Sequence, residues 1–331
     1  MSPRFQSFLI IQTAFIGDVI LATGLIEKLH QHYPEASIDF LVRKGNEGLL
    51  IGHPFLRNVL IWNKKESKLS NLFKVINQVK SNRYDCVVNV HRFASSGLIT
   101  GLSGSKWKIG FDKNPLSFML SKKVEHEIGN LHEVERNHLL IKDITDDTSA
   151  KPKLYPSEKD FEKARPIQNE PYLCIAPTSV WFTKQFPAEK WIEFLKSVAS
   201  AARKIVLLGA SSDHSVCESI RLASNNTNVV NAAGKLSFLE SAALMKGAVM
   251  NFVNDSAPMH LASAMNAPVT AVFCSTVPSF GFGPLSDRSI IVETKEKLEC
   301  RPCGLHGFRA CPKGHFKCAH SIPIDELVNS I

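Results

Sequence analysis

Short apolar runs alternate with longer amphipathic stretches along the first half of the chain. The longer stretches repeat apolar residues at helical spacing, and the short runs have the length of buried strands. Polar and turn-forming residues separate the two kinds of segment. The pattern predicts strands over 8–11, 38–42, 59–62, 86–90 and 107–110, and helices over 19–32, 69–79 and 131–144.

The stretch from Thr145 to Pro171 interrupts this alternation because it is polar and contains several prolines. Such a composition is typical of a segment between domains. After it the alternation restarts. The pattern there predicts strands over 173–176, 205–208, 229–231, 250–253 and 268–273, and helices over 188–201, 215–222 and 238–246.

Two halves that each alternate strands with helices predict an α/β fold with two parallel sheets. We expect two Rossmann-like domains, residues 1–155 and 156–331, that face each other across a cleft. In sheets of this kind, ligands bind where the carboxyl ends of the strands lead into helices. The candidate chemistry is therefore expected in the loops that follow the strands.

Composition narrows the class of protein. The chain has 331 residues, of which 44% are hydrophobic and 21% are charged, which suits two globular domains and excludes a disordered or fibrous chain. No apolar run is long enough to span a bilayer, and polar residues interrupt the apolar start of the chain after Ile11. We therefore expect a cytoplasmic protein.

The net charge of +8 is concentrated in the first half of the chain. Residues 1–165 hold 24 Lys and Arg against 18 Asp and Glu, whereas residues 166–331 hold 15 against 13. A basic half favours an anionic partner, although each of these side chains is also an ordinary surface residue. No nucleic-acid-binding motif is present, so nucleic acid is not an expected partner. The basic residues in question are Lys64, Lys65, Lys68, Lys74, Lys80, Arg83 and Arg92.

The loop after the first strand ends in Gly17 and Asp18 and leads into a long helix. Gly17 suits a tight turn, and Asp18 at the head of the helix either caps it or accepts a proton from an incoming hydroxyl as a general base. Thr13 and Gly17 are the candidate acceptor contacts in this loop.

The loop after strand 173–176 carries two hydroxyls, Thr178 and Ser179, and a cation, Lys184, before a helix that begins near Pro187. Hydroxyls and a cation on a loop that leads into a helix form a cradle for a diphosphate leaving group.

The segment after strand 250–253 breaks into a helix whose first turn carries Asp255, Ser256 and Pro258. Either Asp255 or Ser256 can cap this helix, and proline is favoured in a first helical turn. The amides at a helix start attract anions, so we expect this segment to face the same diphosphate.

A weaker signal follows strand 205–208, where Gly209 allows close approach of the backbone and Asp213 can hydrogen-bond a ribose. Neither half contains the G-x-G-x-x-G fingerprint of dinucleotide-binding enzymes. Its absence counts against a nicotinamide or flavin cofactor, and we expect no cofactor.

Three segments, 11–19, 181–187 and 255–262, together resemble glycosyltransferase family 9. Its best-known members are the ADP-heptose:lipopolysaccharide heptosyltransferases, and the chain is most similar to the heptosyltransferase II type. The resemblance implies a GT-B fold, with an N-terminal domain for the acceptor and a C-terminal domain for an ADP-sugar. It also implies inversion at the anomeric carbon without a catalytic metal.

Residue by residue, the resemblance implies that Asp18 is the general base and that Lys184 meets the diphosphate. It implies that the donor is held by Thr178, Ser179, Asp255, Ser256, Ala257 and His260. Two positions depart from the family pattern, since many members have glycine at Ala257 and some have arginine near Gln12. Asp213 aligns only loosely, and its ribose contact is a separate expectation.

Four cysteines crowd the segment 300–318, with Cys300 and Cys303 in a C-x-x-C pair followed by Cys311 and Cys318. Such a group can bind zinc, form disulfides or remain as free thiols, and the spacing does not decide among the three. We assign no metal ligand here. The remaining cysteines lie in or beside apolar segments and are expected in the core.

The expected function is transfer of a heptose from ADP-heptose to an anionic, lipid-linked oligosaccharide of the lipopolysaccharide inner core. Such an acceptor places the enzyme in peripheral contact with the inner face of the cytoplasmic membrane. The alternatives are a transferase of the same fold with another nucleotide-sugar or acceptor, a nucleotide-sugar epimerase, and a binding protein without activity.

Overall fold

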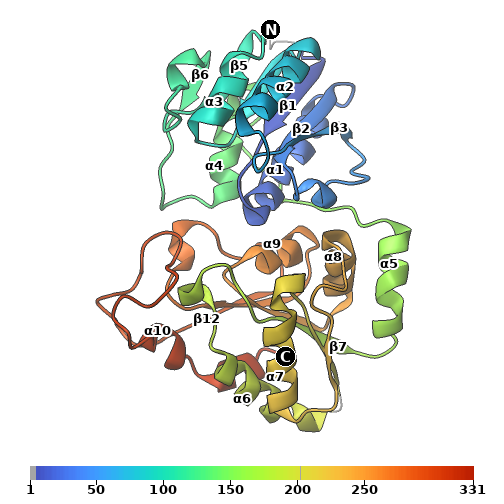
Figure 1. Cartoon of the computed structure of the whole chain (residues 1–331), viewed down its shortest axis with the longest axis vertical. Coiled ribbons are helices and arrows are strands. Elements are labelled where there is room, and N and C mark those ends of the chain that lie inside the picture. Colours follow the sequence, from blue (N-terminus) through green and yellow to red (C-terminus); the bar gives the residue numbers. More distant parts are fainter. Residues whose placement is uncertain (1–4, 202) are drawn as a thin grey trace. The chain divides into compact units, whose positions relative to one another are not determined.

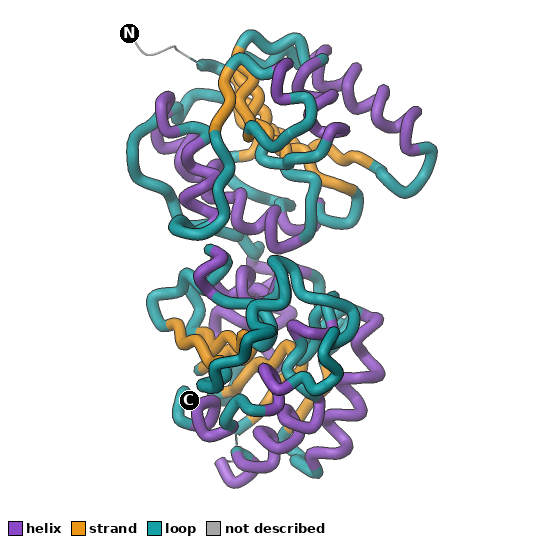
Figure 2. Tube along the Cα trace, turned by 90° about the vertical axis from the view of Figure 1, so that its left-hand side faces the viewer, coloured by secondary structure: helices purple, strands orange, loops and turns teal. Residues whose placement is uncertain are grey.

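The computed structural model describes residues 5–201 and 203–331. The chain divides into two compact units, Met1–Tyr155 and Pro156–Ile331. Each unit is built on a six-stranded sheet in which all neighbouring strands are parallel. Helices lie on both sides of each sheet (Figures 1 and 2). A parallel sheet covered in this way buries both faces, which explains its continuous apolar strands.

In unit 1 the strand order is β3-β2-β1-β4-β5-β6. The central strand β1, Phe8 to Ile11 in particular, is fully buried because it has a neighbour on each side and helices above and below. The strands are β1 Ser7–Ile11, β2 Ser37–Arg43, β3 Leu56–Trp62, β4 Cys86–Asn89, β5 Trp107–Phe111 and β6 Lys122–Val124. The helices are α1 Ile16–His32, α2 Lys68–Ser81, α3 Ala94–Gly101 and α4 Glu133–Leu139.

In unit 2 the strand order is β12-β11-β10-β7-β8-β9. A large apolar core, which includes Trp191, Phe194 and Phe252, packs between the sheet and its helices. The strands are β7 Tyr172–Ala176, β8 Lys204–Leu207, β9 Val229–Asn231, β10 Met250–Asn254, β11 Val269–Phe273 and β12 Ser289–Glu293. The helices are α5 Glu158–Ala164, α6 Ala188–Ser197, α7 His214–Ser224, α8 Phe238–Gly247, α9 Ala257–Ala264, α10 Lys317–His320 and α11 Ile324–Val328.

Six of the described strands and α-helices were not predicted from the sequence: β6, β12, α3, α5, α10 and α11. The predicted helix over 131–144 is shorter than expected, because α4 ends at Leu139 and a 3₁₀ turn follows at Lys142–Ile144. The interdomain stretch contains α5, a single short helix whose start is closed by reciprocal hydrogen bonds between Ser157 and Asp160. Its largely polar sequence conceals it.

The two sheets have the same strand order when strands are counted from the start of each unit. The first and fourth strands are neighbours at the centre, β1 with β4 and β7 with β10. The connections run in opposite directions on either side of this pair, so a crevice opens at the carboxyl ends of the two central strands. In both units the crevice is the place where a ligand site is expected.

No helix among the described residues combines the length and the apolar character that a membrane span requires.

Candidate active site

Lys184 and Asp255 form an ion pair at the crevice of unit 2. The loop after β7 brings Lys184 to the end of β10, where its Nζ lies 2.7 Å from Asp255 Oδ2. The Thr276 hydroxyl, beyond the end of β11, donates a hydrogen bond of 2.6 Å to the same oxygen. The Asp255 side chain is only 5% exposed and that of Lys184 15%. An ammonium has three donors, and Asp255 is its only ion-pair partner within the described residues.

Asn254, the last residue of β10, fixes the loop that carries Lys184. Its Oδ1 accepts the Phe186 N–H at 2.8 Å, and its Nδ2 donates to the Pro177 carbonyl at 2.9 Å. One buried amide therefore holds both ends of the loop, next to Thr178 and Ser179. Thr178 and Ser179 are half-buried, at the edge where Lys184 lies.

Helix α9 begins immediately after this ion pair. Ser256 occupies the N-cap position with extended backbone, and Ala257 and Pro258 form the start of the first turn. Of the two residues that the sequence allows as caps, Asp255 does not take this role, because its carboxylate faces Lys184 and Thr276. Within the described residues the Ser256 side chain makes no capping bond either. Pro258 has no N–H and the Met259 N–H donates to the Ser256 carbonyl at 3.0 Å, so the first turn offers an anion the Ala257 N–H and the positive end of the helix dipole.

The remaining donor-side candidates occupy different positions. His260 is a buried residue of α9, one turn beyond Ser256. Asp213 ends a 3₁₀ turn after β8, and its Oδ2 accepts the Ala210 N–H at 2.8 Å. A Cβ on Gly209 would lie 2.9 Å from that of Asp213, so the glycine accommodates the aspartate itself. The ribose contact of Asp213 stays a prediction.

Thr13 and His91 meet across the crevice of unit 1. The Thr13 hydroxyl lies 3.0 Å from His91 Nδ1, and these residues follow the neighbouring strands β1 and β4. Lys64, beyond the end of β3, donates to Thr13 Oγ1 at 3.0 Å and to the Thr13 carbonyl at 2.8 Å. The carboxyl ends of three strands therefore meet in one hydrogen-bonded chain.

Burial lowers the pKa of two members of this hydrogen-bonded group, His91 and Lys64. Burial, with the nearby Lys64, Arg92 and Arg43, lowers the pKa of His91 to about 3. Burial, with Arg43 and Lys68, lowers the pKa of Lys64 to about 8. At neutral pH, His91 is therefore uncharged and Lys64 remains mostly protonated.

Asp18 is the third residue of α1, and its Oδ2 accepts the N–H of the N-cap residue Phe15 at 3.1 Å. It is half-buried. The Asp18 charge opposes the lowering of the Arg43 pKa that burial causes, and it adds to the raising of the buried Glu133 pKa. Asp18 thus caps α1 and faces the same polar edge as Arg43. Its role as a base is a proposal.

Gly17 does not form the predicted tight turn. It is the second residue of α1, and the turn between strand and helix is made by the residues before it. Arg43 and His91 were not singled out from the sequence, although Arg43 is the last residue of β2 and His91 lies just beyond the end of β4. The signal that would have found them is a polar residue at or just after the end of a buried strand, sought at every strand of the sheet.

The cysteines of segment 300–318 are free thiols in this structure, as are the other four. Among the described residues, no three His, Cys, Asp or Glu side chains are arranged to hold a metal ion. Burial, together with the other cysteines of the segment, raises the pKa of the Cys303 and Cys318 thiols.

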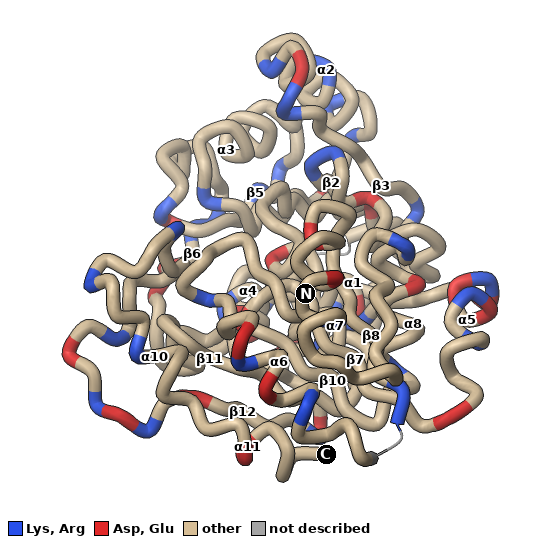
Figure 3. Tube along the Cα trace, turned by 60° about the horizontal axis from the view of Figure 1, so that its bottom comes forward, with Lys and Arg blue, Asp and Glu red and all other residues tan. Residues whose placement is uncertain are grey.

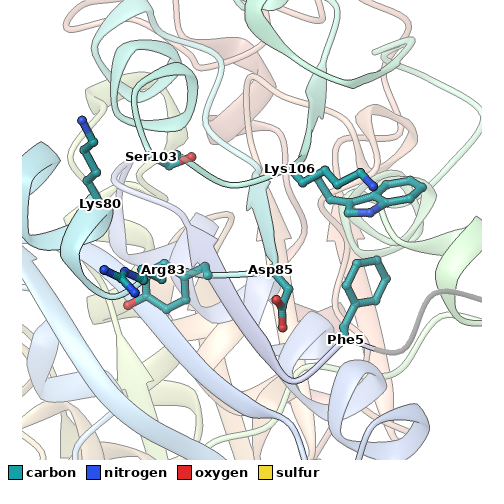
Figure 4. Close-up of a pocket in the computed structure, with 9 residues that line it drawn as sticks. Phe5, Lys80, Arg83, Asp85, Ser103 and Lys106 are labelled. Carbon is teal, nitrogen blue, oxygen red and sulfur yellow. The ribbon is translucent and has the colours of Figure 1, made fainter.

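A separate pocket of about 430 Å³ lies at the opposite edge of the unit 1 sheet, where β4 and β5 begin (Figure 4). Lys80, Arg83 and Lys106 line it, but Arg83 and Lys106 lie on opposite sides with Asp85 between them. The Asp85 carboxylate accepts the N–H groups of Gln6 and Ser7. The pocket contains none of the predicted site residues.

Comparison with known proteins identifies the family. Residues 72–306 match the model for glycosyltransferase family 9 (heptosyltransferase). The chain belongs to glycosyltransferase family 9. The protein is therefore an enzyme, a glycosyltransferase, and the alternatives of an epimerase and of an inactive binding protein are set aside.

Individual members of family 9 are similar to the chain over most of its length. Lipopolysaccharide heptosyltransferase 3 of Escherichia coli is 28% identical over 281 residues, which are 79% of this chain and 82% of that one. The structure of E. coli ADP-heptose lps heptosyltransferase II superposes with a TM-score of 0.81 at 19% identity and covers 98% of this chain and 97% of its own. An E. coli heptosyltransferase with ADP-2-deoxy-2-fluoro heptose has a TM-score of 0.68 at 19% identity and covers 87% and 93%. These likenesses confirm the predicted α/β fold of the GT-B type.

Proposed function

We propose that this member of family 9 transfers a heptose from ADP-heptose to a sugar of the lipopolysaccharide inner core, with inversion at the anomeric carbon. The family is described by its heptosyltransferases, and the similar E. coli protein is a lipopolysaccharide heptosyltransferase. A similar solved structure holds an ADP-heptose analogue. The observation that carries the proposal is the Lys184–Asp255 pair at the start of α9, in the crevice of a nucleotide-binding type of sheet.

On the donor side, the proposal assigns the diphosphate to Lys184 and to the start of α9, with its Ala257 N–H and its helix dipole. The leaving group gains negative charge as its bond to the anomeric carbon breaks. A cation that is already in place stabilises this charge without reorganising. Thr178 and Ser179 offer hydroxyls on the same loop, and Ser256, Ala257 and His260 belong to the adjoining helix.

On the acceptor side, the proposal makes Asp18 the general base. The acceptor hydroxyl oxygen forms its bond to the anomeric carbon while its proton passes to the Asp18 carboxylate. The bond from that carbon to the diphosphate oxygen breaks, and ADP leaves with the electron pair. Because this displacement takes place from the opposite side of the sugar, the anomeric configuration inverts.

We further propose that transfer needs no added divalent cation, since Lys184 and the helix start meet the leaving-group charge. The Asp255 carboxylate, which lies at this edge, is already engaged by Lys184 and Thr276. We expect activity to persist in excess chelator.

The acceptor is proposed to be anionic because cations gather at the edge that holds Asp18. Arg43 ends β2 and Lys64 follows β3, and both lie close to the Thr13 loop. Lys64 donates to Thr13, and the Arg43 guanidinium lies 4.8 Å from the centre of the Phe15 ring. Thr13 and Gly17 of this loop remain the proposed acceptor contacts. Phosphate groups on an oligosaccharide would be attracted to these cations.

We also propose that the enzyme works at the inner face of the cytoplasmic membrane and contacts it through helix α2. Residues 64–124 hold twelve Lys and Arg against three Asp and Glu, a local net charge of +9. Several of these basic positions lie on α2 and the loop before it (Figure 3). Leu69 and Phe73, one turn apart on α2, are 70% and 58% exposed. Apolar side chains among cations suit the surface of an anionic bilayer.

The proposed function is tested by nucleotide release. Purified enzyme is incubated with ADP-heptose, with and without heptose-free lipopolysaccharide, and free ADP and the glycosylated product are measured. We expect ADP to appear only with acceptor, in equal amount to the product. UDP- and GDP-linked sugars should give no release. Acceptor-independent conversion of the sugar nucleotide would contradict the proposal and revive the epimerase alternative.

A further inference from the structure

The segment 300–318, which the proposed mechanism does not use, is hydrogen-bonded to the loop that carries Lys184. Thr183, the residue before the lysine, donates its N–H to the Phe308 carbonyl at 3.1 Å. The Phe308 N–H in turn donates to Thr183 Oγ1 at 2.7 Å. Two reciprocal bonds therefore fix the position of the backbone next to Lys184.

Thr183 is fixed on its other side by Ser275, which lies just beyond the end of β11. The Ser275 hydroxyl donates to Thr183 Oγ1 at 3.0 Å, and the Ser275 N–H donates to the Thr183 carbonyl at 3.2 Å. Both side chains are almost completely buried, at 1% and 0% exposure. Thr183 thus joins the sheet of unit 2 to segment 300–318.

Gly307 packs directly against the Lys184 side chain. Its φ is +74°, and a Cβ built on it would lie 2.9 Å from Thr183 Oγ1, 3.0 Å from Lys184 Cγ and 3.4 Å from Lys184 Cδ. Any side chain at this position would therefore press on the aliphatic stem of the lysine. The bare backbone of Gly307 limits the directions that this stem can take.

The start of segment 300–318 is hydrogen-bonded to the residues after β11, one of which holds Asp255, the ion-pair partner of Lys184. The Arg301 guanidinium donates to the carbonyls of Cys274 at 2.8 Å and Thr276 at 2.9 Å, and Cys303 N–H donates to the Ser275 carbonyl at 2.8 Å. Thr276 is the residue whose hydroxyl holds Asp255. Both members of the ion pair are therefore held through residues 301–308.

We propose that residues 301–308 are positioning residues that hold Lys184 Nζ at the start of α9, so that its charge is in place when the leaving group departs. This inference rests on the proposed function, because it assumes that Lys184 stabilises the leaving diphosphate. It assigns a role to the cysteine-bearing segment that requires neither a metal nor a disulfide. The segment acts through contact with Thr183 and the lysine stem.

The matched pair of variants is Gly307→Ala and Gly314→Ala. Both glycines have positive φ, +74° and +72°, but a Cβ on Gly314 would meet nothing within 4 Å. Backbone strain is therefore similar in the two variants, and only Gly307→Ala presses on Lys184. A second pair, Thr183→Val and Thr183→Ser, removes or keeps the hydroxyl that bonds Phe308 and Ser275.

The measurements are kcat, the KM for the ADP-sugar and the thermal melting temperature. We expect Gly307→Ala and Thr183→Val to lower kcat about tenfold to a hundredfold with a smaller change in KM, as misplacement of a charge-stabilising group does. Gly314→Ala should keep the kcat of the parent enzyme within about twofold, and Thr183→Ser should recover most of the activity.

Lys184→Ala distinguishes the inference from the proposed function. If the segment acts through the lysine, Gly307→Ala should change kcat less than about twofold in the Lys184→Ala background. Suppose that Lys184→Ala lowers kcat and that Gly307→Ala still lowers kcat by its full factor in the Lys184→Ala enzyme. That result would overturn the positioning role and leave the proposed function standing. A Lys184→Ala enzyme that turns over at the parent rate would overturn both. Because Thr183→Val adds no bulk, it decides the question if Gly307→Ala does not fold.

Discussion

The Lys184 ammonium lies 2.7 Å from the Asp255 carboxylate, and the two residues come from loops that follow the neighbouring central strands of unit 2. Their pairing fixes a positive charge at the start of α9 while keeping a buried carboxylate compensated. The same contact therefore serves folding stability and the proposed chemistry, and the two contributions can be separated by experiment.

Loss of either partner should destabilise the enzyme more than loss of both. Lys184→Met leaves Asp255 buried without its cation, and we expect the free energy of unfolding to fall by about 3 kcal/mol. The double variant Lys184→Met/Asp255→Asn should recover at least half of this loss, because no uncompensated charge remains. Denaturant unfolding of the parent, Lys184→Met, Asp255→Asn and the double variant measures the loss in each single variant and the recovery in the double variant. Additive losses would show that the pair is not coupled in solution.

Asp18→Asn should abolish transfer and leave the fold intact. The amide oxygen of asparagine still accepts the Phe15 N–H, so α1 keeps its cap, but the amide cannot take a proton. We expect kcat to fall by about 10²–10⁴-fold with unchanged binding of the ADP-sugar by calorimetry.

Asp160→Asn is the matched control for this experiment, since the Asp160 carboxylate accepts the Ser157 N–H in the same way at the start of α5. That variant should retain full activity. An active Asp18→Asn enzyme would mean that Asp18 is only a cap.

His91 should make unit 1 sensitive to acid. Its pKa is lowered to about 3 in the folded protein, whereas the unfolded chain titrates near 6.5. Between these values the unfolded state binds a proton that the folded state does not, so stability is lost as the pH falls below 6.5. The His91 contribution should amount to about 2 kcal/mol between pH 6.5 and 4.5.

The check is the free energy of unfolding of the parent and of His91→Gln over this range of pH. The variant should depend less steeply on pH, whereas substitution of the exposed His306 by Gln should follow the parent curve. Parallel curves for the parent and His91→Gln would contradict the lowered pKa.

Helix α2 should bind anionic vesicles through its exposed apolar pair. Leu69→Ser and Phe73→Ser each remove a side chain that would enter the bilayer surface, and each should weaken binding by about 1 to 2 kcal/mol, roughly tenfold. Sedimentation with vesicles that contain phosphatidylglycerol measures the loss of binding. High salt should release the parent enzyme from the same vesicles, because it screens the basic residues.

Leu222→Ser supplies the control for vesicle binding, because Leu222 is 60% exposed on a helix of unit 2. Equal losses in all three variants would exclude α2 as the specific contact.

The central strands were predictable because each is a continuous apolar run that the sheet buries on both faces, as at Phe8–Ile11 and Leu173–Ala176. The edge strand β6 was not predictable, since Lys122–Val124 is only three residues long and two of these are lysines. Helix α3 contains two glycines and two serines, which are weak helix formers, and packing against its neighbours decides its conformation.

The positions of the candidate residues after the strands were also predictable, but their partners were not. The sequence allows Asp255 to cap α9, and nothing local indicates that Lys184 and Thr276 compete for its carboxylate. These contacts depend on which strands are neighbours. The role of Gly307 is equally hidden, because it arises from a distant lysine stem that needs room beside it.

Arg301 has a consequence for any attempt to shorten the enzyme. Its guanidinium supplies hydrogen-bond donors to the carbonyls of Phe273, the last residue of β11, and of Cys274 and Thr276, which follow the strand. A truncated chain that stops before this arginine would lose these donors, together with the core residues Phe316, Ile322 and Leu327. The last tenth of the polypeptide is thus part of the framework of unit 2, and trimming it is no route to a minimal transferase.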